Sequence, residues 1–166
     1  TSHPRELSKH CSRLLRYGDV VVARRILLLN GPNLNLLGTR EPAIYGSATL
    51  ADHVGAVESA CAQIGWTLQH LQSNVEGELV DAVHSARSTA DAIIINPGAF
   101  THYSWAIHDA LAAFEGPIVE VHISQPLKRE EWRHTSVVAP LALGTIAGFG
   151  AVGYTLAVEA LARHFG

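Results

Sequence analysis

The chain has 166 residues and a formal net charge of −3, with 48% hydrophobic and 16% charged residues. This length predicts one domain, which can bury about 70% of the surface of its unfolded chain. The weakly acidic balance gives no reason to expect a nucleic acid or an anionic membrane as partner, and the apolar runs are too short to span a bilayer.

The cysteine and histidine patterns favour a reducing, cytoplasmic location and give no support for a metal site. The two cysteines, Cys11 and Cys61, form neither a disulfide framework nor a metal-ligand spacing. Ten histidines are present, but neither His-Glu-x-x-His nor Cys-x-x-Cys occurs. Residues 1–23 lack the apolar segment and cleavage site of a secretory signal. We interpret them as an extension ahead of the domain and expect part of it to be mobile.

Strands and helices are expected to alternate along the rest of the chain. Residues 26–29 form an uninterrupted apolar run, typical of a strand in a parallel sheet, and Asn30-Gly31-Pro32-Asn33 ends it. Thr49 is a plausible N-cap of a helix that Gly65 ends. The further elements expected in chain order are a strand over 66–72, a helix from about 78 to 89, a strand over 92–95, a helix over 103–114, a strand over 118–123, a charged loop or short helix over 125–135, a strand over 144–147 and a helix over 150–165.

This alternation predicts a three-layer α/β sandwich formed by residues 24–166 as a single domain. The natural topology is flavodoxin-like, with a five-stranded parallel sheet in the order 2-1-3-4-5. In that order the carboxyl ends of the first, third and fourth strands are neighbours. Polar residues from several segments should therefore gather at one edge of the sheet: Asn33, Asn96, His102, Glu120, His122 and Ser124.

Residues 34–46 are predicted to form a hinged lid that carries Arg40 and Tyr45, because Pro42 prevents a helix through its middle. A tyrosine with a pKa of about 10 is a poor base unless its phenolate is favoured. An arginine charge about 4 Å away is worth roughly 4 kcal/mol at an effective dielectric constant of about 20, and a shift of two pKa units needs only about 2.7 kcal/mol. The alternative is a surface loop whose tyrosine packs on the body of the domain and whose arginine is solvated.

Glu120 and His122 are two positions apart on an expected strand and therefore share a face, so Glu120 could orient the imidazole and set its tautomer. The alternative is a histidine satisfied within the core. Ser124 lacks the Gly-x-Ser-x-Gly setting of a serine nucleophile. His102 and Arg133 could hold hydroxyls or a carboxylate, or cap a helix and lie in solvent. Together these groups suggest proton abstraction next to a carbonyl, with acid-assisted loss of a leaving group.

Two other classes of function stay open at this point. One is a flavodoxin-like binding or signalling module that holds a small anion at the strand ends. The other is a flavin or nucleotide protein, since Gly148 to Gly153 match Gly-x-Gly-x-x-Gly. That motif should follow the first strand and precede an acidic residue by about 20 positions. Only thirteen residues follow Gly153, so close packing between strand and helix is the better interpretation.

Four motifs carry a specific resemblance to a known family. They are Asn-Gly-Pro-Asn-Leu-Asn-Leu-Leu-Gly-x-Arg-x-Pro-x-x-Tyr-Gly from Asn30, Gln-Ser-Asn-x-Glu-Gly from Gln72, Asn-Pro-Gly-Ala-Phe-Thr-His from Asn96, and Glu-Val-His-Ile-Ser from Glu120. Over about residues 25 to 165 the chain resembles type II 3-dehydroquinate dehydratase, also called type II dehydroquinase.

The resemblance implies a flavodoxin-like lyase that works without cofactor, metal or Schiff base. It would dehydrate 3-dehydroquinate to 3-dehydroshikimate by trans-elimination through an enolate, in the shikimate pathway of aromatic biosynthesis or in quinate catabolism. Tyr45 would abstract the C2 proton as a phenolate favoured by Arg40. His122, supported by Glu120, would protonate the departing C1 hydroxyl, and Asn33 would hold a water that stabilises the enolate oxygen.

The same resemblance assigns the substrate contacts. Asn96, Ile123 and Ser124 would bind the carboxylate, while His102 and Arg133 would hold ring hydroxyls.

The family's assembly, a homododecamer built from trimers, would place Asp109 at the site of a neighbouring subunit. The chain departs from the family pattern at Gln125, where an asparagine is common, and at Trp105, where a smaller apolar residue is usual.

Overall fold

The computed structural model describes residues 22–39 and 47–166. The predicted lid residues Arg40 and Tyr45 lie outside the described residues, as does nearly all of the predicted extension over residues 1–23. No helix in the described ranges combines the length and the apolar character needed to cross a membrane.

A five-stranded parallel sheet forms the middle layer, in the order β2-β1-β3-β4-β5. Its strands are β1 (Arg25–Asn30), β2 (Thr67–Gln72), β3 (Ala92–Asn96), β4 (Ile118–His122) and β5 (Gly144–Ala147). The helices are α2 (Leu50–Gln63), α3 (Glu76–Thr89), α4 (Trp105–Ala112) and α5 (Val152–Phe165). The flavodoxin-like strand order predicted from the sequence is thus confirmed.

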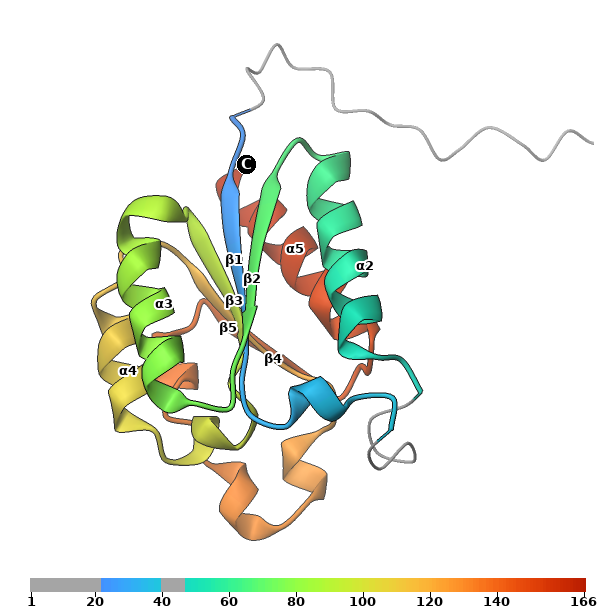
Figure 1. The fold of residues 1–166 in the computed structure, drawn as a ribbon, viewed down its shortest axis with the longest axis vertical. Helices are drawn as coiled ribbons and strands as arrows, with labels where there is room; N and C mark the ends of the chain where they lie inside the picture. Colours follow the sequence, from blue (N-terminus) through green and yellow to red (C-terminus); the bar gives the residue numbers. More distant parts are fainter. Residues whose placement is uncertain (1–21, 40–46) are drawn as a thin grey trace, which may run out of the picture.

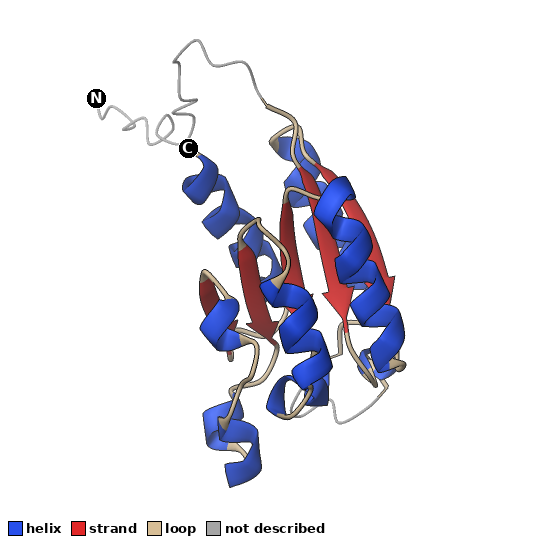
Figure 2. Ribbon diagram, turned by 90° about the vertical axis from the view of Figure 1, so that its left-hand side faces the viewer, coloured by secondary structure: helices blue, strands red, loops and turns tan. Residues whose placement is uncertain are grey.

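Helices cover both faces of the sheet (Figures 1 and 2), and an apolar cluster lies between the sheet and the helices on each face. On one face α2 and α5 pack on alternate residues of β1, β3 and β4, with Leu28, Ile94 and Val121 almost fully buried. On the other face α3 and α4 cover the intervening residues, such as Leu29 and Ile95. Both faces of the central strands are buried, which explains their uninterrupted apolar runs.

The helix starts follow local capping chemistry. The Thr49 side chain accepts a hydrogen bond from the Asp52 backbone N–H, and the Asp52 carboxylate accepts one from the Thr49 N–H at 2.8 Å, so the predicted N-cap is confirmed as a capping box. Helix α4 begins at Trp105, two residues later than expected, because residues 98–102 form a 3₁₀ turn and Ser104 caps the helix. Shorter 3₁₀ turns are Leu34–Leu36, Pro126–Lys128, Glu131–His134 and Ala139–Leu141.

The loops after β1 and β3 touch each other at the carboxyl edge of the sheet. The Gly31 N–H donates to the carbonyl oxygen of Asn96 at 2.8 Å. A Cβ on Gly31 would lie 2.1 Å from the Pro97 carbonyl oxygen, so only glycine permits this approach. The contact brings both strand-end motifs to one place, where the predicted site lies.

Candidate active site

A pocket opens at the carboxyl edge of the sheet, where the sequence predicted it. Its walls come from the loops after β1, β3 and β4 and from the 3₁₀ turns that follow β4. Seven of the residues predicted to act there line it: Asn33, Asn96, His102, His122, Ile123, Ser124 and Arg133. Glu120 lies behind His122, fully buried. Asp109 is exposed on α4 and does not line this pocket.

Asn33 is held at the pocket mouth by an unusual backbone conformation. Its φ of 67° is the only positive value among the described non-glycine residues, and asparagine is one of the few residue types that adopt it readily. The Asn33 N–H donates to Asn74 Oδ1 at 2.9 Å, which ties the β1 loop to the loop after β2. The backbone is therefore fixed at the residue that the sequence assigned to the site.

His122 and Glu120 form the ionisable pair that their spacing on the strand predicted. Nε2 of His122 lies 2.8 Å from Oε1 of Glu120. A carboxylate oxygen can only accept, so Nε2 carries a proton and Nδ1 is the nitrogen left for other partners. The carboxylate thus sets the tautomer of the neutral ring and faces the charge of the protonated ring.

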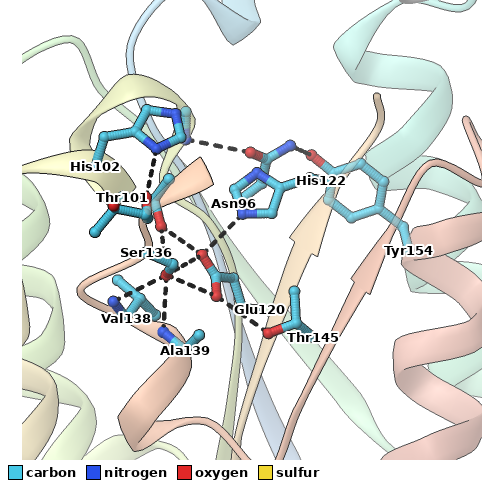
Figure 3. A network of polar contacts seen from close by, with 12 residues as sticks. Asn96, Thr101, His102, Glu120, His122, Ser136, Val138, Ala139, Thr145 and Tyr154 are labelled. Carbon is cyan, nitrogen blue, oxygen red and sulfur yellow. Dashed lines mark hydrogen bonds and ion pairs between the residues drawn. The ribbon is translucent and has the colours of Figure 1, made fainter. Parts of the chain in front are cut away.

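Three hydroxyl groups surround the buried Glu120 carboxylate (Figure 3). Thr101 Oγ1 donates to Oε1, and Thr145 Oγ1 donates to Oε2 at 3.2 Å. Ser136 Oγ lies 2.9 Å from Oε1 and 3.0 Å from Oε2. The Ser136 oxygen also accepts the N–H groups of Val138 and Ala139, at 3.1 and 2.8 Å. We call Thr101, Ser136 and Thr145 the hydroxyl cage.

The surroundings of Glu120 keep it ionised in spite of its burial. Burial alone would raise the pKa of this carboxyl, but the hydrogen bond and charge of His122 and the hydroxyls of Thr101 and Ser136 outweigh it. The pKa of Glu120 therefore lies below its ordinary value, and the group is a carboxylate at neutral pH.

His102 and Arg133 face the pocket from two segments that an aromatic ring connects. Nδ1 of His102 donates to the Thr135 carbonyl oxygen at 2.7 Å, which leaves Nε2 for a ligand. Burial lowers the pKa of His102, which favours its neutral form at pH 7. The rings of Trp132 and His102 meet edge to face, with centroids 5.3 Å apart. The Arg133 guanidinium carbon lies 4.0 Å from the centroid of the Trp132 ring, so the two groups stack. Arg133 Nε also donates to Glu130 at 2.7 Å.

Within Gly148 to Gly153, Gly153 packs α5 against β4 and β5, as expected, whereas Gly150 faces open space. A Cβ on Gly148 would lie 3.1 Å from the Cβ of Gln125, and one on Gly153 would meet Val121 and Ile146 at 3.5 and 3.6 Å. Gln125, the first departure from the family pattern, therefore packs against a glycine. In the ranges 22–39 and 47–166, no three His, Cys, Asp or Glu side chains cluster as a metal site requires.

The hydroxyl cage is the part of the site that sequence reasoning missed. Thr101 lies inside the Asn-Pro-Gly-Ala-Phe-Thr-His motif but received no role. Thr145 is paired in register with Glu120 across β4 and β5, so a correct register would have found it. Ser136 follows no motif and no period, and no signal in the sequence points to it.

Comparisons with known proteins identify the family to which the chain belongs. The family model described as Dehydroquinase class II matches residues 24–162. The chain is 54% identical over 143 residues to a catabolic 3-dehydroquinase of Verticillium alfalfae, covering 86% of this chain and 95% of that protein. It is 54% identical over 140 residues to a 3-dehydroquinate dehydratase of a Jannaschia species, covering 84% and 95% of the two chains.

Solved structures give the same answer. The type II dehydroquinase from Butyrivibrio crossotus superposes with a TM-score of 0.82 at 44% identity, covering 84% of this chain and 98% of that one. The type II dehydroquinase from Propionibacterium acnes superposes with a TM-score of 0.81 at 43% sequence identity, covering 85% of this chain and 97% of that one. The resemblance read from the four motifs is confirmed, and the chain belongs to the class II dehydroquinase family.

Proposed function

We propose that the protein dehydrates 3-dehydroquinate to 3-dehydroshikimate by trans-elimination, without a cofactor. The observation that carries the proposal is the pair formed by His122 and the buried Glu120, placed at the pocket of a chain in this family. The named relatives support the substrate, and they include both catabolic enzymes and enzymes named simply 3-dehydroquinate dehydratase. Both aromatic biosynthesis and quinate breakdown use this step.

His122 would act as the general acid for the leaving hydroxyl. Nε2 is occupied by Glu120, so the proton that is transferred would come from Nδ1 of the protonated ring. As the bond from C1 to its hydroxyl oxygen breaks, that proton completes a water molecule. The Glu120 carboxylate stabilises the imidazolium before the transfer, and the hydroxyl cage keeps the carboxylate in place.

Tyr45 would be the base, with Arg40 favouring its phenolate; both lie outside the described residues. The phenolate would take the C2 proton, and the electrons of that bond would form an enolate on the C3 carbonyl. When the enolate collapses, C1 and C2 become doubly bonded and the C1 hydroxyl departs. Asn33 would hold a water that stabilises the enolate oxygen, and its fixed backbone supports this role.

The pocket offers suitable groups for the rest of the substrate. Asn96, the Ile123 and Ser124 backbone and the Ser124 side chain would bind the carboxylate. His102, through its available Nε2, and Arg133 would hold ring hydroxyls. A planar guanidinium that stacks on an aromatic ring is well oriented for such contacts.

We also propose that the protein acts in the cytoplasm as a homododecamer built from trimers. The exposed position of Asp109 on α4 is compatible with a contact to a neighbouring subunit's site. Asp109→Ala should then weaken assembly, which analytical ultracentrifugation would show.

The deciding experiment mixes purified protein with 3-dehydroquinate and follows the ultraviolet absorbance of the conjugated enone. A second portion of the enzyme is treated with substrate and borohydride, freed of both by dialysis and then assayed, because this treatment would inactivate an enzyme that forms a lysine Schiff base. Enone formation that borohydride leaves unchanged is the expected result. Folded protein that forms no enone but binds the substrate would instead be a binding module, the other class that the sequence left open.

A further inference from the structure

A series of hydrogen-bonded polar side chains runs from Asn96 at the pocket through Tyr154 and Asn30 to His70 on β2. Asn30 and Asn96 are the last residues of β1 and β3 and are paired in register. Both are almost fully buried, and the fully buried Tyr154 of α5 places its hydroxyl between them. Tyr154 lies 2.5 Å from Asn30 Oδ1 and 2.9 Å from Asn96 Nδ2. Figure 3 shows Asn96 and Tyr154 pointing toward each other.

Donor and acceptor can be assigned in only one way along this series of side chains. The Gly98 N–H can only donate, so the Asn96 atom 3.2 Å from it is Oδ1. The other end of the Asn96 amide, Nδ2, then donates to the Tyr154 oxygen, and the single phenolic proton goes to Asn30 Oδ1. Asn30 Nδ2 finally faces Nε2 of His70 at 3.1 Å. Every group then has a matching partner.

This arrangement decides what Asn96 offers to the pocket. One of its two amide protons is taken by Tyr154, and the other is available to an acceptor oxygen of a ligand. An amide held at both ends does not turn when the ligand arrives, so less ordering is needed on binding.

We propose that Tyr154 is a positioning residue, which together with Asn30 fixes the Asn96 amide so that it donates to the carboxylate of the substrate. Tyr154 does not line the pocket and acts through Asn96 alone. The inference rests on the proposed function, in that the ligand is the carboxylate substrate.

The surroundings of Tyr154 suit this role. The ring of His53 packs against that of Tyr154, with centroids 5.3 Å apart. Burial raises the pKa of Tyr154 above its ordinary value, so the phenol stays neutral and keeps the proton that Asn30 accepts. The hydroxyl is therefore a fixed part of the structure throughout the working pH range.

Tyr154→Phe tests the proposal, because it keeps the ring and removes only the hydroxyl. We expect KM for 3-dehydroquinate and Kd for quinate, a carboxylate with similar ring hydroxyls measured by calorimetry, to rise about tenfold, with a smaller change in kcat. Val158→Ala is the matched control, because it removes buried apolar atoms from the same helix and Val158 takes no part in the hydrogen bonds of Asn96, Tyr154 and Asn30. It should lower Tm while leaving KM and Kd unchanged.

A double-mutant cycle with Asn96→Ala separates positioning from general damage. In the Asn96→Ala background, Tyr154→Phe should raise the quinate Kd by less than twofold. An equal rise in both backgrounds, or an unchanged Kd in folded Tyr154→Phe protein, would overturn the proposal. If Tyr154→Phe does not fold, Asn30→Ala takes its place in the same cycle with the same expected pattern.

The quinate measurement also separates this inference from the proposed function. If the wild-type protein binds quinate but forms no enone, the proposed activity fails while the role of Tyr154 is still tested by Kd.

Discussion

Replacing Ser136 by alanine should destabilise the protein by about 3 kcal/mol, although this residue belongs to no sequence motif. The Ser136 oxygen accepts two backbone N–H groups, from Val138 and Ala139, and its proton goes to the Glu120 carboxylate (Figure 3). The buried Val138 N–H left without a partner costs about 1 kcal/mol, the lower end of the usual range, and the half-buried Ala139 N–H about half of that, while the hydrogen bond to the charged group contributes about 1.5 kcal/mol. For a domain of this size, about 3 kcal/mol corresponds to a fall in Tm of roughly 10 °C.

The pH dependence of this loss identifies Glu120 as its origin. A carboxyl whose pKa is depressed by folding stabilises the protein above its ordinary value of 4.5, and that stabilisation is lost as the pH falls through the lowered value. Without the Ser136 hydroxyl the pKa of Glu120 returns part of the way to normal, so this contribution becomes smaller. The difference between wild type and variant should therefore be largest at neutral pH and narrow as the pH falls through 4.5.

Urea unfolding at several pH values, at a fixed protein concentration, measures both effects. Ser85→Ala is the control, because Ser85 is exposed on α3 and its hydroxyl donates to the Asp81 carbonyl oxygen at 3.0 Å. Ser85→Ala should change the free energy of unfolding by no more than about 0.5 kcal/mol. The role given to the hydroxyl cage would be refuted if Ser136→Ala changed the free energy of unfolding as little as Ser85→Ala does. It would also be refuted if the loss in free energy of unfolding were the same at every pH.

Three further substitutions test the acid, the base and an unpaired buried group. Tyr45→Phe should nearly abolish enone formation while quinate binding persists in calorimetry, and near-normal turnover would remove Tyr45 from the role of base. His122→Ala should lower kcat by roughly 10²-fold or more, the size of a general-acid contribution; a loss below about fivefold would contradict it. His53 Nε2 is buried without a hydrogen-bond partner in the described structure, so His53→Leu should stabilise the protein by about 1 kcal/mol in urea unfolding. Burial lowers the pKa of His53 below its ordinary 6.5, so the wild type loses stability as the pH falls below 6.5 and the advantage of the variant should grow between pH 7 and 5.

The fold could be predicted because its signals are local. Buried strands show as apolar runs, and Thr49 and Gly65 mark the ends of α2 where expected. The helix α4 begins two residues later than predicted, because Tyr103 and Ser104 connect the 3₁₀ turn over residues 98–102 to the helix and Ser104 caps it. Boundaries depend on individual hydrogen bonds, such as the one that the Ser104 hydroxyl accepts from Ile107, and these leave little trace in hydrophobic periodicity.

The Glu120 and His122 pair could be predicted for the same local reason, since two positions on a strand share a face. Tyr154 could not be, because an aromatic residue at helical spacing normally indicates a core position, and it does occupy one. Its second role, through the hydroxyl, depends on Asn30, which is 124 residues away in the chain.

A buried glutamate in the middle of a parallel strand indicates in advance that partners must exist, because an unpaired charge there would cost far more than a domain of this size can tolerate. The sequence therefore shows that Glu120 needs hydrogen-bond partners, but it does not show which residues they are. The three hydroxyl partners lie 16 to 25 residues away in the chain, in segments that share no sequence pattern. Such partners become visible only once the sheet order and register are known, as Thr145 shows by pairing with Glu120 across β4 and β5. For a polar residue at a buried strand position, the neighbouring strands should therefore be searched for hydrogen-bond partners once the topology is known. Only after that search should a catalytic role be assigned to the residue.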